Sequence, residues 1–324
     1  MNNVKKNLLV TLADKKYLDF AKSLFSGVYF NSGWQGDYML LAHQVPEEDL
    51  KWFKDKGILI KKCEPLAEKL AGRWPATILS KLYLFTPEFR QWDKIIYLDA
   101  DLIVCASLDK LLKVKKIGAI KHDHFTPTKL KFYFEKYGAS QADYLLAQKK
   151  YNLSRPTFVS SLMVINSQII KEDTFANLSK LWRQYQNSSG GLEEIALNLF
   201  FGNLWENLPA PYCLTVDYFI NHTNLKPKNL KGMVINFFVY NKPLNFFEHF
   251  YQQWKINFDR ANEINLNNRL PATKIWSQKE IWGYSLYLRI KVLIHSLDYA
   301  VGLLGLWLKK SCPALYHFLK NLKF

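Results

Sequence analysis

Two carboxylates, Asp99 and Asp101, lie two residues apart at the end of the apolar run 94–98. A short apolar run rich in β-branched residues is typical of a buried strand. Side chains two apart on an extended chain point to the same side, so these carboxylates would converge if the chain stays extended. Burying like charges unpaired is costly, and a hard divalent cation with oxygen ligands offsets that cost. The pair therefore predicts a Mg2+ or Mn2+ site, whose open positions suit the phosphate oxygens of a nucleotide.

The same two residues have a second interpretation, in which Asp99 caps the next helix and Asp101 pairs with a lysine or arginine. Their context favours the metal site. The pair closes the strand and precedes the start of a capped helix at residues 107–112. This places it at the carboxyl end of a strand, where open α/β sheets bind their ligands.

The elements around this pair alternate between strands and helices. Apolar runs predict strands at residues 8–12, 38–42 and 58–60, and helical spacing predicts a helix over residues 15–30. This order predicts a right-handed, parallel α/β sheet. Further helices are expected at 77–85, 168–185 and 193–201, and further strands at 158–165 and 233–239. We expect one domain over residues 1–245 and a helical extension over residues 246–324.

The composition restricts the classes of protein to which this chain can belong. The 324 residues are 49% hydrophobic and 15% aromatic, which is enough for a sizeable core. Four cysteines lie far apart with no C-x-x-C spacing, which argues against a zinc site or a disulfide framework. The first apolar run is too short for a signal peptide core, so we expect a cytoplasmic protein. The formal charge of +16 favours an anionic partner, but no nucleic-acid motif is present, so nucleic acid is not expected.

The last 50 residues differ in composition from the rest. From residue 275 onward seven lysines and arginines face only Glu280 and Asp298, and aromatic residues are interleaved with them. Basic residues mixed with aromatic ones suit an anionic membrane surface. The apolar segment 292–308 contains His295 and Asp298, so it suits the membrane interface better than a membrane span. We expect a peripheral protein on the inner face of the membrane; the alternative is an amphipathic helix packed on the domain.

Five sequence segments in order resemble the glycosyltransferase family 8 enzymes. They are Leu9-Val10-Thr11-Leu12 followed by Tyr17, Ser80-Lys81-Leu82, Ile96-Tyr97-Leu98-Asp99-Ala100-Asp101 with Leu108-Asp109, Glu193-Glu194-x-x-Leu197-Asn198, and Val234-Ile235-Asn236-Phe237 with Lys242-Pro243. The resemblance implies a Rossmann-like GT-A domain. It also implies a UDP-sugar donor bound with Mn2+, whose sugar is transferred with retention of anomeric configuration.

The resemblance also implies roles for single residues. The metal ligands would be Asp99, Asp101 and Asn236, and the residues at the reacting face would be Glu193 and Glu194. Donor contacts would come from Thr11 and Tyr17 to uracil and ribose, from Lys81 and Lys242 to the pyrophosphate, and from Asp123 to the sugar hydroxyls. Tyr17 also suits a core position on the first helix, and either lysine also suits the surface.

Three departures from the family pattern affect these roles. Asn236 stands where the family has histidine, Val159 replaces an asparagine, and Glu193-Glu194 replaces an Asp-Gln pair. An amide oxygen is a weaker donor to Mn2+ than imidazole. The sequence thus predicts a metal-dependent retaining transferase that moves a hexose from a UDP-sugar to a glycan or glycolipid, with the lipopolysaccharide core as a candidate acceptor. The alternative is a catalytically silent relative that binds a sugar nucleotide or an anionic glycolipid as an interaction module.

Overall fold

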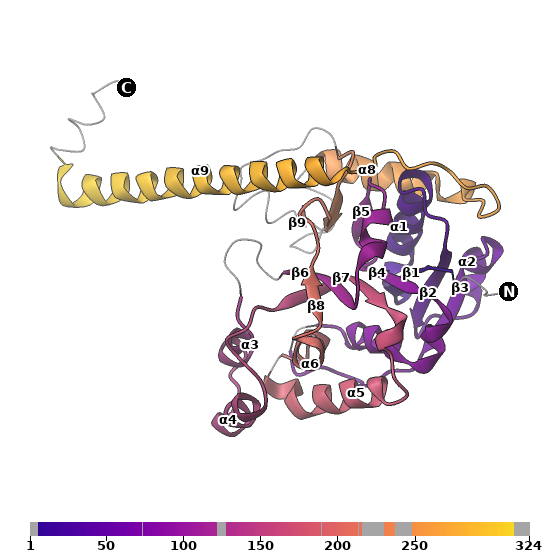
Figure 1. Ribbon diagram of the computed structural model, residues 1–324, viewed down its shortest axis with the longest axis horizontal. Helices are drawn as coiled ribbons and strands as arrows, with labels where there is room; N and C mark the ends of the chain where they lie inside the picture. Colours follow the sequence, from indigo (N-terminus) through magenta and orange to yellow (C-terminus); the bar gives the residue numbers. More distant parts are fainter. Residues whose placement is uncertain are drawn as a thin grey trace.

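The computed structural model describes residues 6–72, 74–121, 128–188, 190–212, 214–215, 230–236 and 248–313. Helices cover both faces of a mixed β-sheet, and one long C-terminal helix extends past this body (Figure 1). Two predicted donor contacts, Asp123 and Lys242, lie outside the described residues, as does the end of the expected strand 233–239.

Seven strands form the main sheet, in the order β3-β2-β1-β4-β7-β6-β8. They are β1 (Leu8–Ala13), β2 (Asp37–His43), β3 (Leu59–Cys63), β4 (Lys94–Leu98), β6 (Ile117–Lys121), β7 (Phe158–Asn166) and β8 (Trp205–Asn207). The first four strands are parallel, as predicted. β7 runs antiparallel to both β4 and β6, so the sheet is mixed. An apolar run identifies a buried strand but does not fix its direction.

The order in which strands are added to the sheet reverses at β1. β2 and β3 follow on one side of β1, whereas β4 lies on its other side. The hydroxyl of Thr11 in β1 donates a hydrogen bond to the carbonyl oxygen of Leu98 in β4, at 2.7 Å, and joins the two strands near their carboxyl ends. Such a switch point is where open α/β sheets bind ligands.

A second sheet lies directly after the carboxylate pair. It has the order β5-β10-β9, with β5 (Leu102–Val104), β9 (Leu214–Thr215) and β10 (Val234–Asn236). A turn separates β4 from β5, in which the amide of Leu102 donates to the carbonyl oxygen of Asp99 at 3.1 Å. The chain is therefore not extended across Asp99 and Asp101, and strand alternation is not what places their side chains.

Both faces of the main sheet are covered by apolar side chains. One face packs against α1 (Leu18–Asn31), which follows the single 3-10 turn Lys15–Tyr17, and α2 (Lys51–Asp55) lies at its edge. The other face packs against α5 (Thr174–Tyr185), α6 (Glu193–Phe201) and a ten-residue 3-10 helix, η3 (Ala76–Phe85). Successive residues of β1 alternate between these cores, as the two-residue period of a strand requires. Residues 77–85 were expected to be helical and are, in the tighter 3-10 form.

Two further pairs of helices complete the described chain. α3 (Lys131–Lys136) and α4 (Gln141–Lys150) pack against α5 and α6 in a small separate apolar cluster. α8 (Glu248–Asp259) packs on α1, and the hydroxyl of Ser23 donates to the carbonyl oxygen of Trp254 at 3.0 Å. α9 (Gln278–Ser311) contacts the body through Ile281 and Leu288 and continues beyond it (Figure 1). Within the described residues, no helix is sufficiently long and apolar to cross a membrane.

Candidate functional site

Four separate segments meet in one buried charged cluster around Lys81. The Lys81 ammonium lies 3.0 Å from Asp99 Oδ1 and 3.1 Å from Glu193 Oε1, and it donates to Ser160 Oγ at 3.0 Å. Lys81 comes from η3, Asp99 follows β4, Ser160 lies in β7 and Glu193 begins α6. The side chains of Lys81 and Glu193 are only 7% and 2% exposed. The structure therefore brings three of the predicted site residues into direct contact at the switch point of the sheet.

Lys81 is held in place by its neighbour in η3. Ser80 shares a 2.8 Å hydrogen bond between its hydroxyl and Nδ1 of His43, which ends β2. Burial alone would lower the pKa of Lys81, but the Asp99 and Glu193 carboxylates raise it well above its usual value. The side chain is therefore a permanent ammonium ion, and it joins the end of β4 to the start of α6.

Asp99 and Asp101 lie close enough to repel one another. Burial raises the pKa of Asp99 most, Lys81 opposes this effect, and the negative charge of Asp101 raises the pKa further. The Tyr97 hydroxyl donates to Asp99 Oδ1 at 2.6 Å, while Asp101 is only 6% exposed. The structure shows Asp99 itself in a salt bridge, with Lys81.

The third predicted metal ligand lies beside this pair. Asn236 is buried and is in register with Leu102, the residue that follows Asp101. Two carboxylates and an amide supply hard oxygen donors, and burial together with the charge of Asp101 raises the pKa of Asp99, so the donor set fits Mg2+ or Mn2+. No group of three or more His, Cys, Asp or Glu side chains could hold a metal ion in the part of the chain that the structure describes. A cation here would thus depend on the amide as its third protein ligand.

Glu193 and Glu194 occupy the first turn of α6, where the helix dipole favours negative charge. Ser160 Oγ donates to Glu193 Oε1 at 2.6 Å, and the Ser160 amide donates to Glu194 Oε1 at 2.9 Å. The Tyr133 hydroxyl of α3 donates to Glu194 Oε2 at 2.8 Å. Glu193 is buried, whereas Glu194 is partly exposed. Both carboxylates are thus fixed in orientation, but only Glu194 can be reached from solvent.

The structure adds residues that sequence reasoning missed, namely Ser160, Tyr97 and Tyr133. Asn198 also contributes, because its side chain donates to the Phe158 carbonyl oxygen and accepts from the Phe158 amide, which locks α6 onto β7. Tyr97 and Asn198 lie inside the segments that carry the family resemblance, and Ser160 follows Val159, one of the departures from the family pattern, so the motifs pointed to all three. Tyr133 lies in no such segment, and nothing in the sequence marks it.

The predicted nucleotide contacts of β1 and α1 differ in accessibility. Thr11 is fully buried, and its hydroxyl is engaged with Leu98, so in this arrangement it joins strands instead of facing solvent. Tyr17 is partly exposed, and its ring lies 5.4 Å from that of Phe20. The role of either residue in nucleotide binding stays a prediction.

The family model described as "Glycosyl transferase family 8" matches residues 8–244. No curated protein sequence matches the chain. Among solved structures, the apo WbbM bifunctional glycosyltransferase is similar with a TM-score of 0.55 and 19% identity, over 82% of this chain and 53% of that one. The chain thus spans about half the length of WbbM.

Two other solved structures share the fold. The galactosyltransferase LgtC, in complex with donor and acceptor sugar analogues, gives a TM-score of 0.57 at 14% identity, over 77% of this chain and 95% of that one. The apo glycosyltransferase GlyE from Streptococcus pneumoniae TIGR4 gives 0.54 at 17% identity, over 84% and 66%. These structures show a shared GT-A-like fold, and the family match covers the whole charged cluster around Lys81. The chain therefore belongs to glycosyl transferase family 8.

Proposed function

We propose that the protein is a metal-dependent retaining glycosyltransferase that moves a hexose from a UDP-sugar to a glycan or glycolipid acceptor. One observation carries the proposal: Lys81, Asp99, Glu193 and Glu194 form one cluster at the carboxyl edge of the sheet, at its switch point. Family membership supports the reaction class. Donor identity and the lipopolysaccharide core as acceptor are proposed by analogy with the family.

The oxygen donors of Asp99, Asp101 and Asn236 would hold Mn2+ or Mg2+. When bound, the cation acts as a Lewis acid that neutralises charge on the diphosphate. Lys81 adds a fixed positive charge at the same edge, where charge builds on the departing UDP. We propose Lys242, Asp123, Tyr17 and Thr11 as further donor contacts on the strength of the family resemblance.

Glu193 and Glu194 have different roles in this proposal, because they differ in solvent exposure. Glu193 is buried against Lys81 and Ser160, so it orients those groups and does not meet the substrate. Glu194 is partly exposed, and two hydrogen bonds fix its carboxylate. A carboxylate held in this way at the reacting face can stabilise positive charge on the anomeric carbon or approach it directly.

Transfer assays with a panel of UDP-sugars, Mn2+ or Mg2+, and a lipid extract test the proposal, with products identified by mass spectrometry. Asp101→Ala should abolish transfer because it removes a metal ligand. Asp259→Ala, at the exposed end of α8 and outside the family match, is the control and should retain full activity. Unchanged transfer by Asp101→Ala would refute the assignment.

A catalytically silent relative is the alternative function, and two observations favour it. Asn236 is a weak third ligand, and Lys81 already neutralises Asp99 without any metal. Calorimetry separates the two functions. Binding of UDP-sugars without turnover over the panel of donors and acceptors supports the silent protein, whereas any metal-dependent transfer excludes it.

The exposed face of α9 supports a membrane surface as a partner. Large apolar side chains recur every three or four residues along it, at Trp282, Leu286, Ile290, Leu293 and Leu297, and they are 42–66% exposed. This stripe lies opposite Ile281 and Leu288, which pack on the body. Exposed basic side chains flank it, including Lys279, Arg289, Lys309 and Lys310. We propose that α9 lies in the interface of an anionic membrane, on the cytoplasmic face.

Flotation with vesicles of anionic or neutral lipids, at low and high salt, tests the membrane proposal. The protein should float with anionic vesicles at low salt, and less so at high salt. Trp282→Gln with Leu293→Gln should abolish flotation. Ile256→Gln, which changes an exposed apolar residue of α8 outside the stripe, should leave it intact. No binding at low salt would refute the proposal.

A further inference from the structure

A row of three hydroxyl groups joins η3 to the carboxyl ends of three parallel strands. Thr77, Ser80 and Tyr83 lie three residues apart in η3, and a 3-10 helix has three residues per turn, so their side chains share one face. The Thr77 hydroxyl donates to Asp14 Oδ2 at 3.2 Å, directly after β1. The Tyr83 hydroxyl donates to the carbonyl oxygen of Glu64 at 3.0 Å, directly after β3. We call these three side chains the hydroxyl row.

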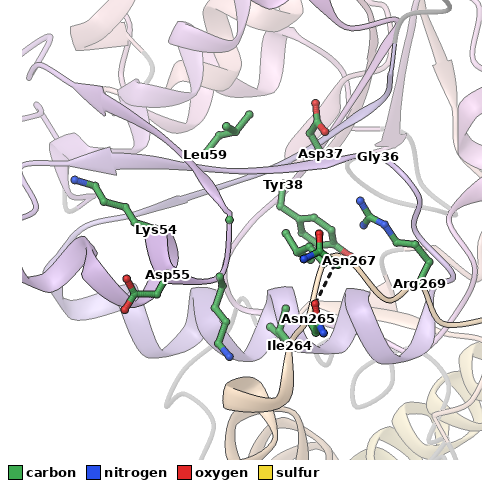
Figure 2. Close-up of a pocket in the computed structure, with 13 residues that line it drawn as sticks. Gly36, Asp37, Tyr38, Lys54, Asp55, Leu59, Ile264, Asn265, Asn267 and Arg269 are labelled. Atoms are coloured by element: carbon green, nitrogen blue, oxygen red, sulfur yellow. Dashed lines mark hydrogen bonds between the residues drawn. The ribbon is translucent and has the colours of Figure 1, made fainter.

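The middle hydrogen bond of the hydroxyl row is buried. Ser80 shares it with Nδ1 of His43, the last residue of β2, at 2.8 Å, and the two residues are 1% and 5% exposed. Burial lowers the pKa of His43, so at pH 7 the imidazole is neutral and Nδ1 can accept from the hydroxyl. The pocket in Figure 2 lies at the opposite end of β2, beside Asp37 and Tyr38, so it is separate from this hydrogen bond.

The hydroxyl row accounts for the form of η3. Runs of 3-10 helix longer than three or four residues are uncommon, yet η3 has ten residues. Its three hydrogen bonds are made to β1, β2 and β3 in turn, which are neighbours in the sheet. In an α-helix, residues three apart are rotated by about 60° from a common line, so the three hydroxyls would no longer face the strand ends together. The row thus fixes both the form of η3 and its position across the edge of the sheet.

Lys81 follows the middle residue of the hydroxyl row. Successive residues of a 3-10 helix point about 120° apart, so the lysine leaves η3 on another face. Its ammonium group reaches Asp99 at 3.0 Å and Glu193 at 3.1 Å. A lysine is a point charge on a flexible four-carbon stem, so the place of its charge depends on how firmly its backbone is held. The hydroxyl row supplies that support.

We propose that the hydroxyl row and His43 are positioning residues, which set Lys81 against the diphosphate of the bound nucleotide. This inference rests on the proposed function, because it takes Lys81 as a diphosphate contact. It requires no contact between these residues and the nucleotide, which agrees with the burial of Ser80 and His43. Thr77, Tyr83 and His43 lie outside the segments that carry the family resemblance.

Calorimetry with UDP and with uridine, in the presence of Mg2+, tests the inference, because the difference between the two affinities isolates the diphosphate. Ser80→Ala and His43→Leu should each lower the affinity for UDP about threefold to tenfold, as the loss of one hydrogen bond allows, and leave the affinity for uridine unchanged. His43→Asn places an amide near the position of Nδ1 and should recover most of the loss. Ser179→Ala removes a buried hydroxyl without a partner from α5 and is the matched control, which should bind both ligands as the wild type does.

A double-mutant cycle shows whether the hydroxyl row acts through Lys81. Ser80→Ala should cause no further loss of UDP affinity when it is added to Lys81→Met. The inference is wrong if Ser80→Ala and His43→Leu bind UDP as tightly as the wild type, if they lose uridine affinity equally, or if the effects of Ser80→Ala and Lys81→Met add. A wild-type protein that binds UDP no more tightly than uridine would refute the proposed function itself, and this inference with it.

Discussion

Replacing Lys81 with methionine should destabilise the fold by about 3–5 kcal/mol, because it removes the cation from a buried ion pair. Methionine fills a similar volume, so the change isolates the charge. Glu193 is 2% exposed and cannot be solvated in place of its partner. For a domain of this size the loss corresponds to a fall in Tm of about 6–20 °C.

Urea unfolding, followed by circular dichroism, measures this loss against a matched control. The exposed pair Lys51–Asp55 has a similar separation, 2.7 Å, but its side chains are 77% and 56% exposed. Lys51→Met should therefore cost less than about 1 kcal/mol. Adding Glu193→Gln to Lys81→Met should recover part of the loss, with a coupling energy of about 0.5–3 kcal/mol. Equal effects of Lys81→Met and Lys51→Met, together with no coupling, would refute the reasoning.

Three further predictions follow from the same site. Tyr133→Phe removes a hydrogen bond to the Glu194 carboxylate and should lower turnover about tenfold to a hundredfold. The control is Tyr185→Phe, which removes a buried hydroxyl without a partner from the same apolar cluster and should leave turnover unchanged. Equal losses of the two variants in transfer assays would contradict this prediction. The pKa of Lys81 is raised from 10.5, so its stabilising contribution is complete below pH 10.5 and is lost as the pH rises further. The urea midpoint should therefore fall more steeply above that pH in the wild type than in Lys81→Met. An equal pH dependence of the two midpoints would contradict this prediction. Mn2+ at about 100 times its Kd should stabilise the wild type by about 2.7 kcal/mol in thermal unfolding, and Asp101→Asn should lose most of this gain; an equal gain would exclude Asp101 as a ligand.

The sequence predicted the parts of this fold that depend on local patterns. The apolar runs before Thr11 and Asp99 became neighbouring parallel strands, because a buried strand needs little more than a short β-branched segment with flanking turns. The helix that begins at Glu193 was expected from its spacing and its acidic first turn, and it forms there. The direction of β7 could not be predicted, because its long connection from β6 permits either orientation.

The candidate site was likewise predicted only where local sequence patterns mark it. The motifs identified Lys81, Asp99 and Glu193, but not that the three form one ion cluster, because Lys81 meets its partners only through tertiary packing. Tyr133 was missed because it comes from α3, in a segment without a recognisable pattern. The turn at Asp99 was missed because it contains neither glycine nor proline, the residues that usually mark one.

The length of α9 has a practical consequence for measurements of size. A helix of 34 residues is about 50 Å long, and it projects from the body (Figure 1). Friction from such a rod slows diffusion, so a 38.0 kDa monomer should elute from a gel-filtration column ahead of spherical standards of equal mass. Light scattering and sedimentation equilibrium measure molar mass independently of shape. These methods should therefore be used to determine the oligomeric state of this protein.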